Sequence, residues 1–213
     1  MQSLRGAKAK EKFVQDYMNI KVLAYRVLLN GDMRKNQCGG ELTDRYYHFT
    51  AIHKNTRKRE NFFLGYDCAR QLMKMLDIPI DSIKLFNPFK QEYSEREISS
   101  GSYTSCNNRV YFTALGRELF DLINLIWIGL SLQDIDILHD IQNKLYENPD
   151  KEPPPSHFKS LNTILNKWNT TIQSIIAKLQ QNNRNFRNFD FTQAREYLKE
   201  YFEKNNINDT IRF

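Results

Sequence analysis

The stretch from Leu115 to Ile128 constrains the fold most, because it is apolar on almost every side of a predicted helix. A helix without a polar face has to be buried among other elements. The residues that follow supply such elements. Apolar positions recur at helical spacing after Ser131–Asp134 (SLQD), which resembles a capping box, and again in Phe191–Lys204. The C-terminal half therefore predicts a set of helices around one buried helix.

Another helix of this half carries a regular apolar repeat. Apolar residues keep a three-four spacing over nearly three heptads at Leu161, Leu165, Trp168, Ile172, Ile175 and Leu179. Two interpretations are open: the helix Leu161–Leu179 packs inside its own bundle, or it pairs with a second copy and makes a homodimer. Consecutive prolines in Glu147–Ser156 predict a stiff linker before it, and Gln180–Asp190 predicts a polar loop after it.

The N-terminal half predicts a mixture of helix and strand. Apolar residues recur at helical spacing from Lys10 to Leu29, which predicts one amphipathic helix. The aromatic, alternating segment Asp44–His53 predicts a strand, and Phe62–Gly65 returns as the second strand of a hairpin. Asp67 is the predicted N-cap of a short helix over Cys68–Leu76.

A change of composition marks the predicted domain boundary. From Leu85 to Arg109 the chain has Pro, Ser, Gly and Asn without periodicity, which is typical of a loop. We therefore expect an α+β module with a basic β-hairpin in residues 1–85, a connecting loop in 86–110 and a helical domain in 111–213. The predicted fold class is α+β, with a mainly helical C-terminal part.

Composition and charge narrow the class of protein. No run approaches the roughly 18 apolar residues of a membrane span, and the basic N-terminus lacks the apolar stretch of a secretory signal. The three cysteines make an odd count without a disulfide framework, which agrees with a reducing compartment. A net charge of +6 permits a polyanionic partner without requiring one. We expect a cytoplasmic protein without a membrane partner.

The residues around the hairpin show an order of parts found in zinc elements. Cys38 lies in a Gly-containing turn (QCGG) before the hairpin, and Cys68 opens the helix after it. A treble-clef zinc finger has this layout, in which the turn and the first helical turn each give ligands. Gln37–Leu76 resembles the Cys-hairpin-Cys zinc elements of small phage and bacterial proteins. The matching residues are Cys38, Gly39, Tyr46, Phe49, Thr56, Leu64, Gly65, Cys68, Ala69 and Leu72.

The resemblance is incomplete, so the element is a degenerate treble-clef-like one. Lys35 stands where the first cysteine of a CxxC pair would be, and Gln71 stands at the second helix-side position. A structural zinc takes four ligands. His48, His53 or Cys106 would complete the set if the fold brings them close, because imidazole also binds zinc.

Three interpretations of the two cysteines are open. In the first, Cys38, Cys68, His48 and His53 bind a structural zinc, and no cofactor apart from this zinc is expected. In the second, the element is metal-free and both cysteines are small buried residues. In the third, Cys68 is a nucleophile activated by its place at a helix N-terminus.

The predicted turn between the hairpin strands is strongly basic. It contains Lys54, Arg57, Lys58 and Arg59, and Glu60 is the one acidic residue beside them. A basic two-stranded ribbon has the right size to enter a nucleic-acid groove or to follow a phosphate backbone. Further basic residues that could join this cluster precede the hairpin, at Lys8, Lys10 and Lys12.

Aromatic residues flank this turn, at Tyr46, Tyr47, Phe62 and Phe63. An exposed ring would stack on unpaired bases. Alternatively the rings are the buried face of the hairpin, and the charges keep an exposed turn in water. A second, weaker cluster in the Asn-rich loop combines Arg184 and Arg187 with aromatic residues.

The sequence contains no complete catalytic motif, whether P-loop, GxGxxG, HExxH or GxSxG. The expected function is therefore non-enzymatic binding of nucleic acid or a nucleoprotein complex through the basic hairpin. A protein–protein effector is the alternative, because small Asn- and Lys-rich proteins with a degenerate finger resemble phage and mobile-element accessory proteins, including inhibitors of host nucleases. A third hypothesis is a metal-dependent ββα nuclease with His48 or His53 as general base. His139 and His157 are interpreted as surface or cap residues.

Overall fold

The structure is a computed structural model that describes residues 2–89, 112–130 and 136–213. The chain divides into an N-terminal unit, Met1–Val110, and a C-terminal unit, Tyr111–Phe213. A small sheet with helices is followed by a helical part, so the predicted α+β class is confirmed. No helix in the described part of the chain is long and apolar enough to cross a membrane.

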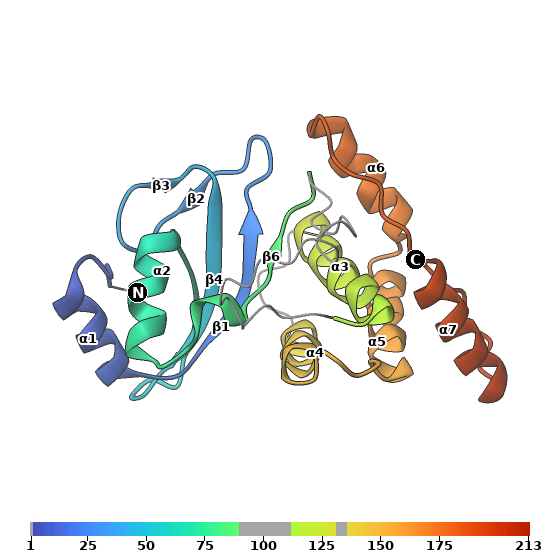
Figure 1. Cartoon of the computed structure of the whole chain (residues 1–213), viewed down its shortest axis with the longest axis horizontal. Coiled ribbons are helices and arrows are strands. Elements are labelled where there is room, and N and C mark those ends of the chain that lie inside the picture. The colour runs from blue at the N-terminus through green and yellow to red at the C-terminus, as the bar shows by residue number, and fades with distance from the viewer. Residues whose placement is uncertain (1, 90–111, 131–135) are drawn as a thin grey trace, which may run out of the picture. The chain divides into compact units, whose positions relative to one another are not determined.

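The N-terminal unit is built on a four-stranded sheet with the order β5-β4-β1-β6 (Figure 1). Its strands are β1 (Tyr17–Val27), β4 (Arg45–His53), β5 (Arg59–Leu64) and β6 (Leu85–Phe86). β4 pairs antiparallel with β1 and with β5, whereas β6 runs parallel to β1. The hairpin β4–β5 agrees with the prediction. The prediction of a loop is wrong for its first residues, because Leu85 and Phe86 form a strand that pairs with β1. Residues 90–110 of the predicted loop lie outside the described ranges.

The predicted helix Lys10–Leu29 is wrong beyond its first part. The helix α1 covers Ala7–Asp16, and the chain then continues as β1. β1 lies between β4 and β6, and Val22 to Tyr25 are all buried. A continuous run of buried apolar residues looks alike in a buried helix and in a central strand. Pairing with β4 decides between the two, because it satisfies the backbone of this segment across the sheet.

One face of the sheet carries the core of the N-terminal unit. The helix α2 (Tyr66–Met75) buries Ala69, Leu72 and Met73, and α1 and α2 lie on the same side of the sheet in Figure 1. The predicted cap is wrong, because Gly65 is the N-cap of α2 and Asp67 lies within its first turn. Before the hairpin, the two-residue strands β2 (Arg34–Lys35) and β3 (Glu41–Leu42) form a small separate ribbon.

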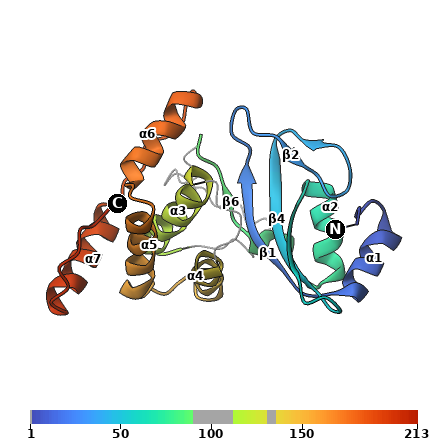
Figure 2. The ribbon, with the colours of Figure 1, turned by 180° about the vertical axis from the view of Figure 1, so that it is seen from behind.

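The C-terminal unit consists of helices in its described residues (Figure 2). They are α3 (Ala114–Gly129), α4 (Asp136–Glu147), α5 (Pro155–Lys167), α6 (Ile172–Asn182) and α7 (Thr192–Lys204). α3 packs against each of the other four, which confirms the predicted buried central helix. Thr113 caps it by accepting a hydrogen bond from the Gly116 amide at 3.0 Å. The predicted capping box Ser131–Asp134 lies outside the described ranges.

The predicted single helix Leu161–Leu179 is wrong, because the chain bends between α5 and α6. Asn169 has a left-handed φ of 45°, and the Thr171 hydroxyl starts α6 by accepting from the Ser174 amide at 3.1 Å. Leu165 and Ile172, one on each side of the bend, are completely buried. The apolar residues of the repeat therefore pack within the C-terminal unit. The homodimer remains a prediction, but the continuous helix on which it was based is absent from the structure.

Candidate nucleic-acid interface and paired cysteines

The turn between β4 and β5 is held by its own hydrogen bonds. The His53 amide donates to the Lys58 carbonyl at 2.9 Å, and the Arg57 amide donates to the His53 carbonyl at 2.9 Å. His53 Nδ1 accepts from the amides of Asn55 and Thr56 at 3.2 and 3.3 Å. Arg57 has a left-handed φ of 57°. The turn is therefore a defined platform, and its residues from Lys54 to Arg59 are all exposed. We call Lys54, Arg57, Lys58 and Arg59 the basic tip.

Lys54 joins the basic tip to α1. Its Nζ donates to the carbonyl oxygens of Val14 and Gln15, and its amide donates to the Asp16 carbonyl at 2.9 Å. The last carbonyls of a helix lack partners within the helix, and a lysine is well suited to satisfy them. Lys54 therefore caps α1, and Figure 1 shows the hairpin turn beside the end of this helix.

The other cations of the tip face solvent. Arg57 Nη1 lies 3.4 Å from Met18 Sδ, a weak acceptor, while Lys58 and Arg59 are exposed. On α1, Lys8 and Lys12 are exposed and lie one helical turn apart. The expectation that Lys10 joins this cluster is wrong, because only 1% of its surface is exposed.

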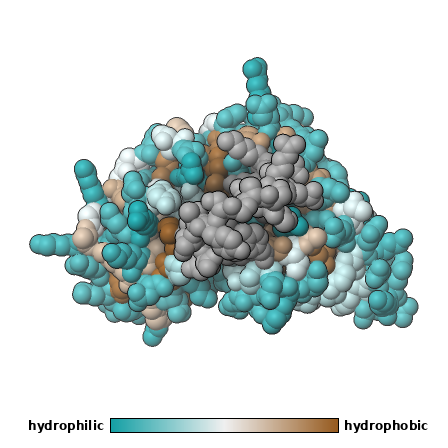
Figure 3. Space-filling model, viewed as in Figure 1, coloured by the Kyte–Doolittle hydropathy of each residue, from teal (hydrophilic) through white to brown (hydrophobic). Residues whose placement is uncertain are grey.

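The aromatic residues beside the tip point into the protein. Tyr46, Tyr47 and Phe62 are each at most 2% exposed. Phe63 is half-buried, with the Arg34 guanidinium 4.9 Å from its ring centroid. On the face shown in Figure 3, the coloured residues are mostly hydrophilic and the apolar ones form small patches. The interpretation of the rings as a buried face is correct for Tyr46, Tyr47 and Phe62, and these three cannot stack on bases.

A hydrogen bond ties the tip to the junction of α1 and β1. Tyr17 Oη donates to Glu60 Oε2 at 3.0 Å. The Tyr17 ring stacks on Phe13 with 4.3 Å between centroids, and it meets His53 edge-on at 4.9 Å. Burial, followed by the Glu60 carboxylate, raises the pKa of Tyr17 from 10.0 to about 12. Residues of α1, β1, β4 and β5 therefore meet beneath the basic tip.

Replacing Tyr17 by Phe should reduce the stability of the N-terminal unit by about 1–3 kcal/mol at neutral pH, because the part-buried Glu60 carboxylate loses a hydrogen-bond donor. The pKa of Tyr17 is raised on folding, so its contribution is fully present below pH 10 and is lost as the pH rises towards 12. Urea unfolding at increasing pH should show wild type losing stability more steeply than Tyr17→Phe over this window. Parallel curves for the two proteins would contradict the assignment.

The second predicted basic cluster, Arg184 and Arg187, lies in the C-terminal unit, and one of its two arginines makes contacts inside that unit. Arg187 Nη2 forms an ion pair with Asp121 Oδ1 at 2.8 Å, and both side chains are less than one-fifth exposed. The Arg187 guanidinium also lies 3.8 Å from the ring centroid of Phe189. Arg184 is exposed. Arg187 therefore fastens the loop after α6 to α3, and of these two arginines only Arg184 offers a solvent-facing charge.

The structure brings together two of the four predicted metal donors. Cys38 and Cys68 belong to one cluster beneath α2, on the face that also holds Tyr47 and Phe49. Alternate residues of a strand point to opposite faces, so His48 points away from this cluster. Its ring packs against Phe63, with 4.8 Å between centroids.

The other predicted donors do not complete the set. His53 stays in the hairpin turn, where its Nδ1 accepts backbone hydrogen bonds. Cys106 lies outside the described ranges. In residues 2–89, 112–130 and 136–213, no three His, Cys, Asp or Glu side chains gather as a metal site. Zinc binding by Cys38, Cys68, His48 and His53 therefore remains a prediction, and the structure does not bring these four side chains together.

A buried lysine accompanies the cysteine pair. Cys38 Sγ donates to the Leu4 carbonyl at 3.2 Å, and Lys10, which is 1% exposed, acts on the pKa of the same thiol. Burial, followed by contact with Cys68, raises the pKa of Cys38 from 9.0 to about 12, while Lys10 opposes the rise. The spacing of Lys10 before Phe13 and Tyr17 is the sequence signal for this burial, because that spacing puts it on the apolar side of α1.

The histidines outside the hairpin are buried, contrary to prediction. His139 and His157 are 6% and 9% exposed. The His139 ring lies 4.2 Å from Trp127, and burial lowers the pKa of His157. His48, a predicted general base of the nuclease hypothesis, is 2% exposed. His48 is therefore not accessible to solvent as the general base that the nuclease hypothesis requires.

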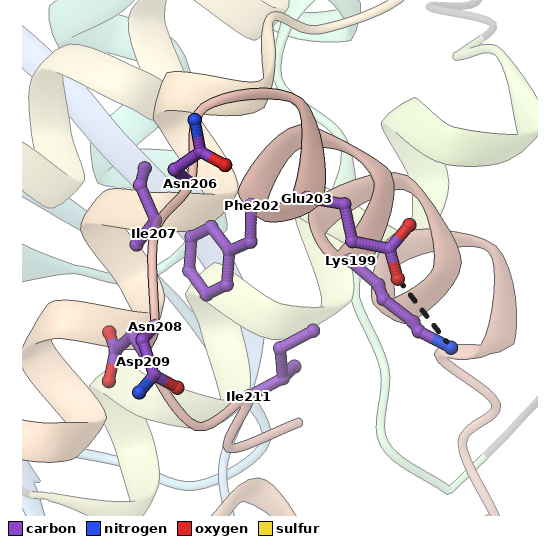
Figure 4. A pocket seen from close by; sticks show the side chains of 8 residues that line it. All are labelled: Lys199, Phe202, Glu203, Asn206, Ile207, Asn208, Asp209 and Ile211. Carbon is purple, nitrogen blue, oxygen red and sulfur yellow. Dashed lines mark ion pairs between the residues drawn. The ribbon is translucent and has the colours of Figure 1, made fainter.

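A shallow pocket in the C-terminal unit has a structural origin. It measures about 450 Å³ and lies between the end of α7 and the segment that follows (Figure 4). Lys199 and Glu203 form an ion pair at its rim, 3.9 Å apart. Asp209 accepts hydrogen bonds from Asn162 and Asn166 of α5 at 3.2 Å. The Asp209 carboxylate thus holds the segment after α7 against α5, and Lys199 and Glu203 pair within α7, so these charged groups of the pocket serve the fold.

Comparison with known protein families identifies a family that matches most of the chain. The model of a family described as Uncharacterised conserved protein UCP028583 matches residues 3–206, which span both units. No curated protein and no solved structure matches the chain.

Proposed function

We propose that this chain, which belongs to the family Uncharacterised conserved protein UCP028583, is a non-enzymatic protein that binds the phosphate backbone of nucleic acid with its basic tip. One observation carries the proposal. Arg57, Lys58 and Arg59 are exposed side by side on a turn that its own hydrogen bonds hold in place. Such a turn presents charges without first having to be ordered, which reduces the entropy lost on binding.

The geometry favours phosphates over bases as the bound groups. Tyr46, Tyr47 and Phe62 are buried and cannot supply a stacking platform. Contacts with phosphate oxygens carry no sequence information of their own, and they weaken steeply with salt. Lys8 and Lys12 extend the positive surface along α1, which Lys54 fastens to the tip. The proposed partner is therefore nucleic acid or a nucleoprotein complex, bound without sequence preference.

The proposed location is the cytoplasm. Cys38 and Cys68 are free thiols in the structure, as expected in a reducing compartment. The proposed binding requires no cofactor. The effector hypothesis, in which the chain inhibits a host nuclease by protein–protein contact, is the alternative that the following experiment separates.

The triple variant Arg57→Ala, Lys58→Ala, Arg59→Ala should bind nucleic acid about a hundredfold more weakly near 0.1 M salt. Each lost phosphate contact lowers the log–log salt slope by about 0.7–0.9, so the slope should fall by about 2–3. The measurement is a salt titration with labelled single- and double-stranded probes. Lys54 is left intact because it caps α1.

A matched control variant removes three positive charges from the C-terminal unit in place of the three removed from the basic tip. Lys159, Lys167 and Lys178 are exposed on α5 and α6, and their joint replacement by Ala should leave affinity and slope almost unchanged. Thermal unfolding of both triple variants should match wild type, because exposed charges contribute little to stability. Equal affinities for the two variants would remove the basic tip from the interface. Wild type that binds neither probe but retains one protein partner would instead favour the effector.

A further inference from the structure

The paired cysteines carry an inference that does not depend on nucleic-acid binding. Cys38 lies in the turn between β2 and β3, and this turn is fastened to the end of β5 because the Gln37 amide donates to the Phe63 carbonyl at 2.9 Å. Gly65 follows β5 and caps α2, and Cys68 lies in the first turn of that helix. Cys38 and Cys68 pack into one apolar cluster, and Cys68 helps to raise the pKa of the Cys38 thiol. Two cysteines thirty positions apart are thus brought into the same cluster by backbone structure.

The two thiols differ in access. Cys68 is partly exposed, whereas Cys38 is 8% exposed and lies behind it, with its Sγ against the Leu4 carbonyl. A small oxidant in water would therefore meet Cys68 first. Cys38 belongs to the same cluster and is the sulfur that would then react with the oxidised Cys68.

A buried lysine, Lys10, accompanies the two cysteines. It is 1% exposed, and its charge acts on the Cys38 thiol by lowering its pKa against the effect of burial. A buried ammonium group is unfavourable unless a polar or anionic partner compensates it. A sulfur that gains negative charge during reaction is such a partner, and the ammonium would stabilise it.

We propose that Cys38 and Cys68 are a reversible oxidation site for hydroperoxides, with Cys68 as the attacking and Cys38 as the resolving sulfur. The Cys68 thiolate attacks one peroxide oxygen, the O–O bond breaks, and the leaving oxygen takes a proton to become water or an alcohol. The resulting sulfenic acid is attacked by Cys38, whose proton leaves with the hydroxyl group as water while the S–S bond forms. The two sulfurs are oxidised and the peroxide is reduced. A thiol reductant restores both cysteines.

The disulfide would have a mechanical effect on the N-terminal unit. It would join the turn before the hairpin to the first turn of α2 and close a loop around the basic hairpin. A crosslink over a loop of this length restricts the unfolded chain and raises the unfolding temperature, provided that the native geometry accepts it. In a reducing compartment such a bond is transient and responds to redox conditions.

The test treats the full chain with hydrogen peroxide and maps its peptides by mass spectrometry. We expect a peptide pair linked through Cys38 and Cys68 that has lost two hydrogen atoms, disappears with dithiothreitol, and accompanies a rise in unfolding temperature of about 5 °C or more. Cys106→Ser should still form the link. Cys68→Ser should leave Cys38 unoxidised under the same treatment, because the attacking sulfur is missing.

Lys10→Met, which keeps the volume of the buried side chain, separates a chemical role from a packing role. Without the ammonium the second step slows, so sulfenic acid trapped on Cys68 by dimedone should increase several-fold over wild type. An unchanged dimedone yield in a folded Lys10→Met protein would overturn the role of Lys10. The whole proposal is overturned if peroxide links only Cys106, or links no cysteines in folded wild type. About one zinc atom per purified chain would overturn it too, because both sulfurs would then be ligands.

Discussion

Phe49→Ala should destabilise the N-terminal unit by about 3–5 kcal/mol, which is a large part of the stability of a small domain. The Phe49 ring is fully buried in the middle of β4 and stacks on Phe62, with 5.3 Å between centroids. Its removal leaves a cavity between the sheet and α2, where Leu72 and Met73 are also fully buried. Because the hairpin depends on this core, nucleic-acid binding should fall as well.

Hydrogen exchange followed by mass spectrometry measures this effect region by region. Amides of β1, β4 and β5 should lose protection, while those of α3 should keep it, because Phe49 belongs to the N-terminal unit alone. Met33→Ala is the matched control in the same unit, since Met33 is 79% exposed and its loss should change stability by less than about 0.5 kcal/mol. Equal loss of protection in both units would show that they unfold together.

Gly129→Ala should destabilise the C-terminal unit by about 1–3 kcal/mol through overpacking. A Cβ atom at Gly129 would lie 2.2 Å from Cγ2 of Ile175 in α6, far inside van der Waals contact. Ile175 is 4% exposed, and its branched side chain has few alternative rotamers. The close approach of α3 and α6 therefore requires a glycine at this position. Urea unfolding monitored by circular dichroism measures the loss.

A double-mutant cycle tests the cause. Ile175→Ala alone should cost about 2–5 kcal/mol as a cavity, but the methyl group introduced by Gly129→Ala fills part of that cavity in the double variant. The double variant should then be more stable than the sum of the single effects by about 0.5–3 kcal/mol. Gly116→Ala in the same helix is a comparison with a smaller expected effect, because its Cβ would be crowded by Thr113 Oγ1 at 3.1 Å and Phe112 Cβ at 3.3 Å without the overlap found at Gly129. Strict additivity at positions 129 and 175 would exclude the steric explanation.

Several elements could be predicted because their signals are local. The strand over Asp44–His53 is rich in aromatic and β-branched residues, and the polar turn after it has few alternatives to a hairpin. The buried helix α3 follows from a stretch that is apolar all round, since such a helix is stable only inside a core. The basic residues of the tip were also identifiable, because a charged turn is exposed in almost any fold.

Other elements depended on partners far along the chain. Tyr17–Val27 has apolar residues that fit a helix as well as a central strand, and only pairing with β4 distinguishes the two. The break between α5 and α6 spans Trp168–Thr171, where a weak local signal competes with an apolar repeat that continues across it. The repeat hides the break, because both helices bury their apolar residues in one core.

Periodicity and turn chemistry act over a few residues, so they were enough to predict the α+β class, the hairpin, the buried central helix and an exposed basic turn. Which chemical groups come together depended on tertiary packing, which buried Lys10 on the side of Cys38, turned His48 to the opposite face from the cysteines and used Lys54 as a helix cap. Contacts between distant residues depend on strand register and on which face of an element is covered, and a shift of one residue in a strand reverses that face.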